Sequence, residues 1–237
     1  MDDRIVTTQP VLTSDQAEEL QRAFVLKVFG WMAAGLMITG IMSMVTVQSQ
    51  AILDLVFANK FVYFGLIIAQ LGLVVWLSAR IGVMSAMTAT LVFAGYSFLT
   101  GLTLSVVFLA YTAESLASTF FVSAGTFAAM FAYGFMTKRD LTSMGSFMTM
   151  GLIGMVIASL VNLFFKSEMI YWISTYIGII VFVGLTAYDA QKIKAMSVIA
   201  LEGDESEQKG AIIGALRLYL DFINLFLLLL RVLGRRK

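Results

Sequence analysis

The stretch Leu218-Tyr-Leu-Asp-Phe-Ile-Asn-Leu-Phe-Leu-Leu-Leu-Leu230, near the C-terminal end, decides the fold class of this chain. One carboxylate, Asp221, interrupts this apolar run, and Asp189 interrupts the preceding one within Gly184-Leu-Thr-Ala-Tyr-Asp-Ala-Gln191. Globular chains are about 45–50% apolar and about 25% charged, whereas this one is 59% hydrophobic and 13% charged. The sequence therefore predicts an all-α polytopic membrane protein.

Apolar runs long enough to span a membrane also occur in the rest of the chain, toward the N-terminus. A run of about 20 apolar residues crosses a hydrocarbon core of about 30 Å, and helices are expected because lipid offers the backbone no hydrogen-bond partner. A single membrane domain over 25–234 is predicted, after a solvated tail at 1–24 in which Thr13 is expected to cap a helix. The seven predicted spans lie at 25–47, 61–79, 83–110, 116–136, 143–165, 169–189 and 212–233.

The orientation of the chain is left open by the charged connections. Basic residues in the even-numbered connections favour a cytoplasmic N-terminus. The sixth connection along the chain is expected to be a long loop from about Lys192 to Gly210, which contains the acidic run 202–207. Four basic residues in the C-terminal tail argue against this orientation, unless the seventh segment is re-entrant. They are Arg231, Arg235, Arg236 and Lys237.

The two aspartates are the main functional candidates. A carboxylate within a membrane span is costly, so it usually faces a bundle interior or a cavity and serves an ionic or protonation role. If Lys192 and Arg217 mark one membrane surface, Asp189 and Asp221 lie level, about 5–6 Å inside it. Such a pair would share a proton and titrate as a unit. When ionised it could bind calcium, with Asn224 adding an amide oxygen from the same helical face.

The alternative to a shared carboxyl site is that each aspartate forms an ion pair with a basic neighbour close to it in the sequence. Asp189 lies three residues before Lys192, and Asp221 lies four residues after Arg217, so two separate ion pairs could form. Arg80, at the end of the second span, could reach the carboxyl pair or extend to the membrane surface. Hydroxyl groups on the third span could line an aqueous path or hydrogen-bond within the bundle. They belong to Tyr96, Thr100 and Thr103.

Other classes of function find little support in the composition. Cysteine and histidine are absent, so proton sensing near neutral pH must come from carboxylates. A net charge of +1 gives no reason to expect a nucleic-acid partner. An intramembrane aspartyl protease would carry its second aspartate in a Gly-x-Gly-Asp motif, which does not precede Asp221. We expect no enzyme activity and no bound cofactor.

Both aspartate motifs resemble the Bax-inhibitor family, the transmembrane Bax inhibitor motif proteins, and in particular its bacterial members. The likeness covers residues 25 to 234 and includes Thr100-Gly-Leu-Thr-Leu104 and Lys138-Arg-Asp-Leu141. It implies a seven-helix bundle with a wrapped central helix, located in the bacterial inner membrane. It also implies a pH-sensitive calcium leak, gated by Asp189 and Asp221 on the sixth and seventh helices. A latching arginine on the second helix is implied too, for which Arg80 is the nearest match.

We therefore expect a membrane protein that passes calcium as its transported ion. The alternative is a non-conducting interaction protein that modulates a membrane protease or a stress or cell-death response. In that case the N-terminal tail or the loop at 195–210 would contact a membrane protein partner.

Overall fold

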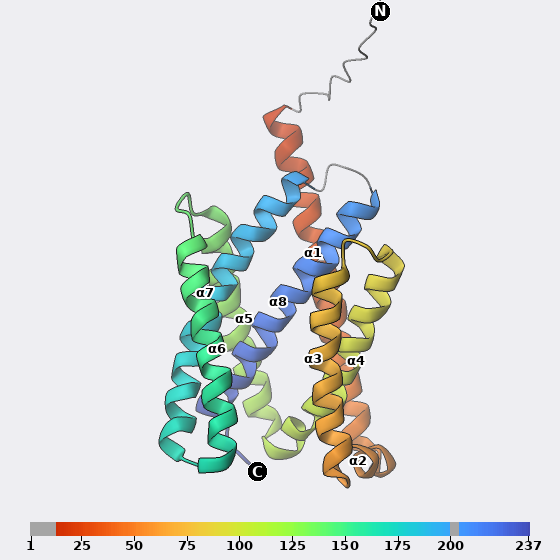
Figure 1. Ribbon diagram of the computed structural model, residues 1–237, viewed down its shortest axis with the longest axis vertical. Coiled ribbons are helices and arrows are strands. Elements are labelled where there is room, and N and C mark those ends of the chain that lie inside the picture. Colours follow the sequence, from red (N-terminus) through yellow and green to blue (C-terminus); the bar gives the residue numbers. More distant parts are fainter. Residues whose placement is uncertain (1–12, 200–203) are drawn as a thin grey trace, which may run out of the picture.

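The computed structural model describes residues 13–199 and 204–237, and within these ranges the chain forms eight helices (Figure 1). Seven are long and apolar enough to cross a membrane, which confirms the predicted class and span count. The eighth, α2 (Gln50–Phe57), is a short helix that the sequence interpretation missed. The spanning helices are α1 (Ser14–Gln48), α3 (Lys60–Arg80), α4 (Ala86–Ala110), α5 (Ala113–Met136), α6 (Thr142–Phe165), α7 (Glu168–Ile199) and α8 (Asp204–Leu233).

Helix α8 lies at the centre of the bundle and crosses it obliquely (Figure 1). In its apolar stretch of 18 residues, 61% of the residues are buried, against 44% or less in the corresponding stretch of every other spanning helix. It packs against α1, α4, α5 and α7. Tyr219 is fully buried, and its hydroxyl lies 2.7 Å from the Thr39 hydroxyl of α1. The helix that carries Asp221 is therefore the one that the other helices surround.

A re-entrant seventh segment, one of the two alternatives left by the sequence, is wrong. Helix α8 is continuous over 30 residues, which is about 45 Å at 1.5 Å per residue and exceeds a hydrocarbon core of about 30 Å. The start of α1 and the C-terminus lie at opposite ends of the bundle (Figure 1).

The basic C-terminal tail is fixed to the connection between α4 and α5. The Thr112 amide donates to the Arg235 carbonyl at 3.1 Å, and the Lys237 amide donates to the Ala110 carbonyl at 3.0 Å. The Lys237 ammonium also donates to the Phe108 carbonyl at 2.9 Å, where the C-terminal end of α4 favours a cation. These contacts explain how so much positive charge is held at the end opposite the start of α1.

The sixth connection is much shorter than predicted. Helix α7 continues to Ile199 and α8 begins at Asp204, so the long loop expected from Lys192 to Gly210 is wrong. Glu205 and Glu207 of the acidic run instead lie in the first turn of α8, where negative charge stabilises a helix N-terminus. Residues 200–203, and residues 1–12 of the predicted tail, lie outside the described residues.

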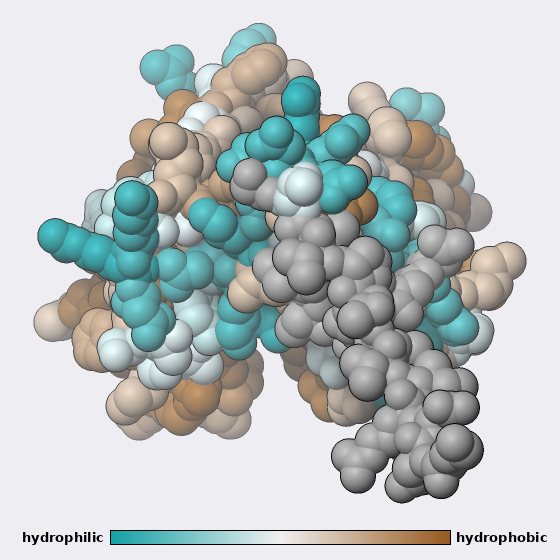
Figure 2. All heavy atoms as spheres, turned by 90° about the horizontal axis from the view of Figure 1, so that it is seen from above, coloured by the Kyte–Doolittle hydropathy of each residue, from teal (hydrophilic) through white to brown (hydrophobic). Residues whose placement is uncertain are grey.

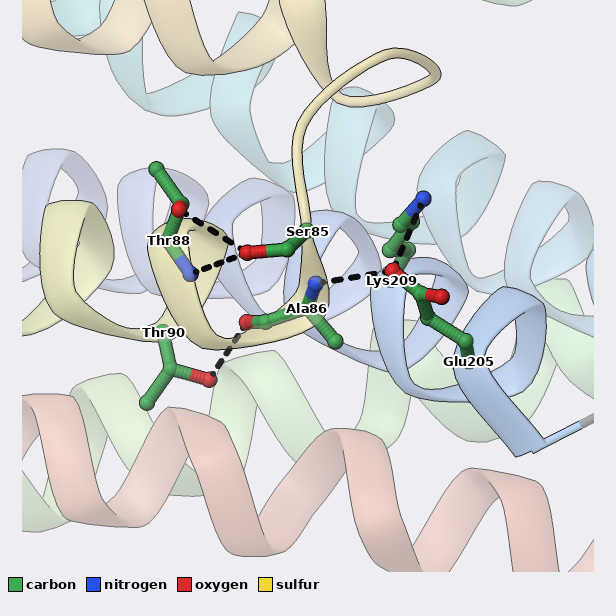
Figure 3. A network of polar contacts seen from close by, with 6 residues as sticks. All are labelled: Ser85, Ala86, Thr88, Thr90, Glu205 and Lys209. Atoms are coloured by element: carbon green, nitrogen blue, oxygen red, sulfur yellow. Dashed lines mark hydrogen bonds and ion pairs between the residues drawn. The ribbon is translucent and has the colours of Figure 1, made fainter.

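Polar contacts organise the end of the bundle where α1 and α8 begin. The Thr13 side chain accepts from the Gln16 amide, and the Gln16 side chain accepts from the Thr13 amide, so the predicted cap is confirmed. Helix α1 thus starts well before residue 25. Glu205 of α8 accepts from the Ala86 amide at 3.3 Å and pairs with Lys209 (Figure 3). Hydrophilic side chains gather over the middle of this end and also reach the rim in places, between the hydrophobic side chains of the flanks (Figure 2).

Two glycines let α5 and α6 approach α7 near Asp189. A Cβ at Gly134 would overlap the backbone of Ala187, and a Cβ at Gly145 would lie 2.5 Å from the Tyr188 ring. Farther along α7, Gln191 accepts from the Leu141 amide at 2.9 Å and so fixes α7 to the start of α6. These contacts set the position of α7, and therefore of Asp189.

Candidate functional site

Both aspartates line one cavity inside the membrane-spanning bundle. It has a volume of about 580 Å³ and is bordered by α3, α4, α6, α7 and α8. Only 7% of Asp189 and 4% of Asp221 is exposed, so neither carboxyl group faces bulk solvent. The charged and titratable side chains that line the cavity are Tyr96, Tyr188, Asp189, Arg217 and Asp221.

Arg217 joins the two helices that carry the carboxylates. Its Nη1 donates to Oδ1 of Asp189 at 3.1 Å, an ion pair between α8 and α7. Asp221 lies four residues beyond Arg217 on α8, about 6 Å further along the helix axis. Asp189, Arg217 and Asp221 all line the same cavity, and charges this close in a buried site act on one another more strongly than in water. The three groups therefore form one electrostatic cluster.

Asp221 is the least satisfied member of this cluster. Its Oδ2 atom is buried and has no hydrogen-bond partner within residues 13–199 and 204–237. A buried polar atom without a partner costs free energy, and an ionised one costs more. Such an atom, lining a cavity, is suited to hold a proton or a cation.

The two predicted local ion pairs do not form among the described residues. Arg217 pairs with Asp189 across the helices rather than with Asp221 on its own helix. The Lys192 ammonium lies 4.9 Å from the centroid of the Tyr188 ring, in a cation–π contact. Lys192 and Arg217 both lie within helices that continue beyond them, and the equal depth of the two carboxylates stays a prediction.

The structure brings Asn224 to the cavity but leaves Arg80 at its own helix end. Asn224 lines the cavity, and its side-chain nitrogen donates to the Leu220 carbonyl at 2.8 Å. Its side-chain oxygen is thus the atom that could bind a cation. Arg80 is exposed in the last turn of α3, and no ion pair joins it to a carboxylate in the described part of the chain. Its latching role stays a prediction.

The three residues whose hydroxyl groups were predicted to line a path or to bond within the bundle lie on α4, and their surroundings differ. Tyr96 lines the cavity. Thr100 donates to the Tyr96 carbonyl at 2.8 Å, and Thr103 donates to the Thr100 carbonyl at 3.1 Å, so both hydroxyls bond within their own helix. Gln70 of α3 also donates to the Thr103 hydroxyl at 3.2 Å. The pore-lining role of the two threonines stays a prediction.

The donor set is sparse for a permanent metal centre. No group of three or more His, Cys, Asp or Glu side chains is gathered for a metal ion in residues 13–199 and 204–237. Calcium takes about 6–8 oxygen ligands in proteins. Two carboxylates and one amide oxygen would therefore leave most positions to water, which suits transient binding.

Comparison with known proteins identifies the family. The family model described as "Inhibitor of apoptosis-promoting Bax1" matches residues 21–237, which is nearly the whole chain. The chain belongs to the Bax inhibitor family. The resemblance carried by the two aspartate motifs is thereby confirmed.

Bacterial members of the Bax inhibitor family are close in sequence over their whole length. Inner membrane protein YbhL of Escherichia coli is 53% identical over 217 residues, covering 91% of this chain and 93% of the relative. Uncharacterized proteins of Rickettsia prowazekii (47% over 235 residues, 98% and 97%) and Borreliella burgdorferi (44% over 227 residues, 95% and 98%) are similar too. With seven spanning helices, the chain is a multi-pass protein of the bacterial inner membrane.

Proposed function

We propose that this protein is a calcium leak whose passage is controlled by protonation of the Asp189–Asp221 cluster. The observation that carries the proposal is the buried, unpartnered carboxylate oxygen of Asp221, which lines a cavity shared with Asp189. An isolated charge at this place needs a proton or a cation to offset its burial.

Charge counting gives the direction of the pH response. With Asp189, Asp221 and Arg217 all ionised, the cluster carries one net negative charge, which attracts a cation. Protonation of Asp221 brings the net charge to zero and removes that attraction. Calcium passage is therefore expected to increase as the pH rises.

Arg217 is the residue that would hold the calcium site closed. Its guanidinium occupies an oxygen of Asp189, so calcium can contact both carboxylates only after this ion pair opens. The resemblance assigns such a role to an arginine on the second helix, for which Arg80 is the match. In our proposal Arg217 takes this part. Weak binding by few protein ligands also lets the ion leave, as conduction requires.

Calcium flux into liposomes tests the proposal. The purified protein is reconstituted around a trapped calcium indicator, and flux is compared with that in empty liposomes. We expect flux in the wild type and a clear loss in Asp221→Asn. Asp54→Asn removes an exposed carboxylate on α2 and should leave flux unchanged. Wild-type flux no greater than that of empty liposomes would refute the leak and favour the interaction protein.

A further inference from the structure

The cavity that holds the aspartates opens sideways between α3 and α6. Helix α3 packs on α2 and α4, whereas α6 packs on α7, and α8 lies behind the space between them (Figure 1). Leu71 and Val74 of α3 line one wall, and Leu152 and Val156 of α6 line the other. Leu71 is 63% exposed and Val156 is 48% exposed. Because these two residues border both the cavity and the outer surface, the cavity reaches the outside of the bundle at this point.

Between Leu71 and Val156 the opening faces hydrocarbon, although the exposed Ser78, two residues before the end of α3, also lines the cavity. Leu71 lies near the middle of α3 and Val156 lies past the middle of α6, away from the ends of both helices. Large apolar side chains flank the opening on its outer side, with Ile68 and Val75 on α3 and Ile153 on α6 each more than half exposed. In a bilayer such residues contact acyl chains. A molecule that enters here comes from the membrane.

The inner end of the cavity is polar and lacks one positive charge. Arg217 is already paired with Asp189. Asp221 presents a buried oxygen with no partner in the described residues. The ionised cluster is therefore one cation short, while the walls between it and the lipid are mostly apolar, with Gln70, Ser78 and Thr149 as the polar exceptions on α3 and α6. An occupant that matches both parts has one hydrocarbon chain and a cationic head that donates hydrogen bonds.

The geometry points to a binding site for a single-chain amphiphilic amine, which enters from the bilayer and places its ammonium at Asp221. A primary ammonium offers three donors and a compact charge. A fatty acid would add a third carboxylate beside two others, and a fatty alcohol would leave the charge unmatched. The volume of about 580 Å³ falls within the range of about 300–1,000 Å³ found for small-molecule sites.

Photo-crosslinking tests this site without any measurement of flux, so its outcome is independent of the calcium leak. The probe is dodecylamine with a diazirine on its chain, added to proteoliposomes of the full chain. We expect crosslinks concentrated on Leu71, Val74, Leu152 and Val156. Excess unlabelled dodecylamine should suppress them, and dodecanol should not. Asp221→Asn should weaken competition by dodecylamine about tenfold, the loss expected for one charge-assisted hydrogen bond.

A matched pair of variants separates the cavity from the lipid-facing surface. Leu152→Trp fills the cavity and should abolish the crosslinks, whereas Ile153→Trp adds the same bulk to the outer face and should leave them. Equal competition by dodecanol and dodecylamine would overturn the proposal. So would crosslinks spread evenly over the lipid-facing helices and unaffected by Leu152→Trp.

Discussion

Replacement of Gly134 by Ala is expected to displace α7 and destabilise the protein. The added Cβ would lie 2.7 Å from the Ala187 Cα, which is 0.7 Å short of the ordinary contact distance of 3.4 Å, and closer still to the Ala187 carbonyl. Backbone atoms cannot swing aside as a flexible side chain can, so the helices must separate. Ala187 is two residues before Asp189, and the displacement would therefore reach the carboxyl cluster.

The size of the effect follows from two opposing terms. Overpacking a tight interior contact costs about 1–3 kcal/mol, whereas Ala is favoured over Gly within a helix by about 1 kcal/mol. Gly125, on the same helix, has open space around the same position. Gly125→Ala should thus gain only the helical term, and Gly134→Ala should unfold more easily than Gly125→Ala by about 1–3 kcal/mol.

Equilibrium unfolding in mixed detergent micelles measures this difference, with the helical content followed as the denaturing detergent is increased. Calcium flux of the same two variants then reports whether the displaced α7 alters the cluster. Equal free energies of unfolding for Gly134→Ala and Gly125→Ala would refute the close approach of α5 and α7 described above.

Three further predictions concern other contacts. Arg217→Gln leaves Asp189 without its cation and should lower the free energy of unfolding by about 1–3 kcal/mol. This is less than for a fully buried pair, because the Arg217 side chain is 39% exposed. The double variant with Asp189→Asn should regain part of the lost stability, as a double-mutant cycle would show. Deletion of 235–237 removes the carbonyl that binds the Thr112 amide, so hydrogen exchange of that amide should accelerate, and unchanged exchange would contradict the tail contact. Hydrogen bonds from Thr142, the first residue of α6, lower the pKa of Asp140. The ionised Asp140 therefore stabilises the fold at a pH above its unfolded-state pKa, and this stabilisation is lost as the pH falls through its lowered folded-state pKa. Asp140→Asn should thus make the free energy of unfolding less dependent on pH at acid pH, as unfolding measured against pH would show.

The sequence predicted the membrane spans well and the helix ends poorly. Apolar runs reveal where a helix crosses lipid, but α7 continues past Lys192 to Ile199, through polar residues that hydropathy assigns to a loop. Helix α8 likewise begins within the acidic run at Asp204. Favourable charge at a helix N-terminus keeps such a turn helical outside the apolar region. Helix α2 was too short to give a recognisable signal.

The sequence predicted the two carboxylates of the candidate site, but not which of them forms the ion pair with Arg217. Asp189 and Asp221 are conspicuous because carboxylates are rare in apolar runs. Arg217 lies four residues before Asp221, and spacing alone favours a pair on the same helix. The rotation of α8 against α7 decides that Arg217 instead reaches Asp189. The position of α7 depends on contacts far apart in sequence, among them Gly134 of α5 with Ala187, which no local pattern reveals.

The pH dependence of calcium flux in Asp221→Asn, beside the wild type, tests the central claim most directly. Flux into proteoliposomes would be recorded at several values from about pH 6 to about pH 8, because a carboxyl pair that shares a proton releases it at a higher pH than an isolated carboxyl group. The account predicts that wild-type flux rises with pH, and that flux in Asp221→Asn is low and does not change with pH. A variant that keeps the wild-type pH dependence would contradict the account, because the carboxyl group proposed to carry the controlling proton would then be dispensable.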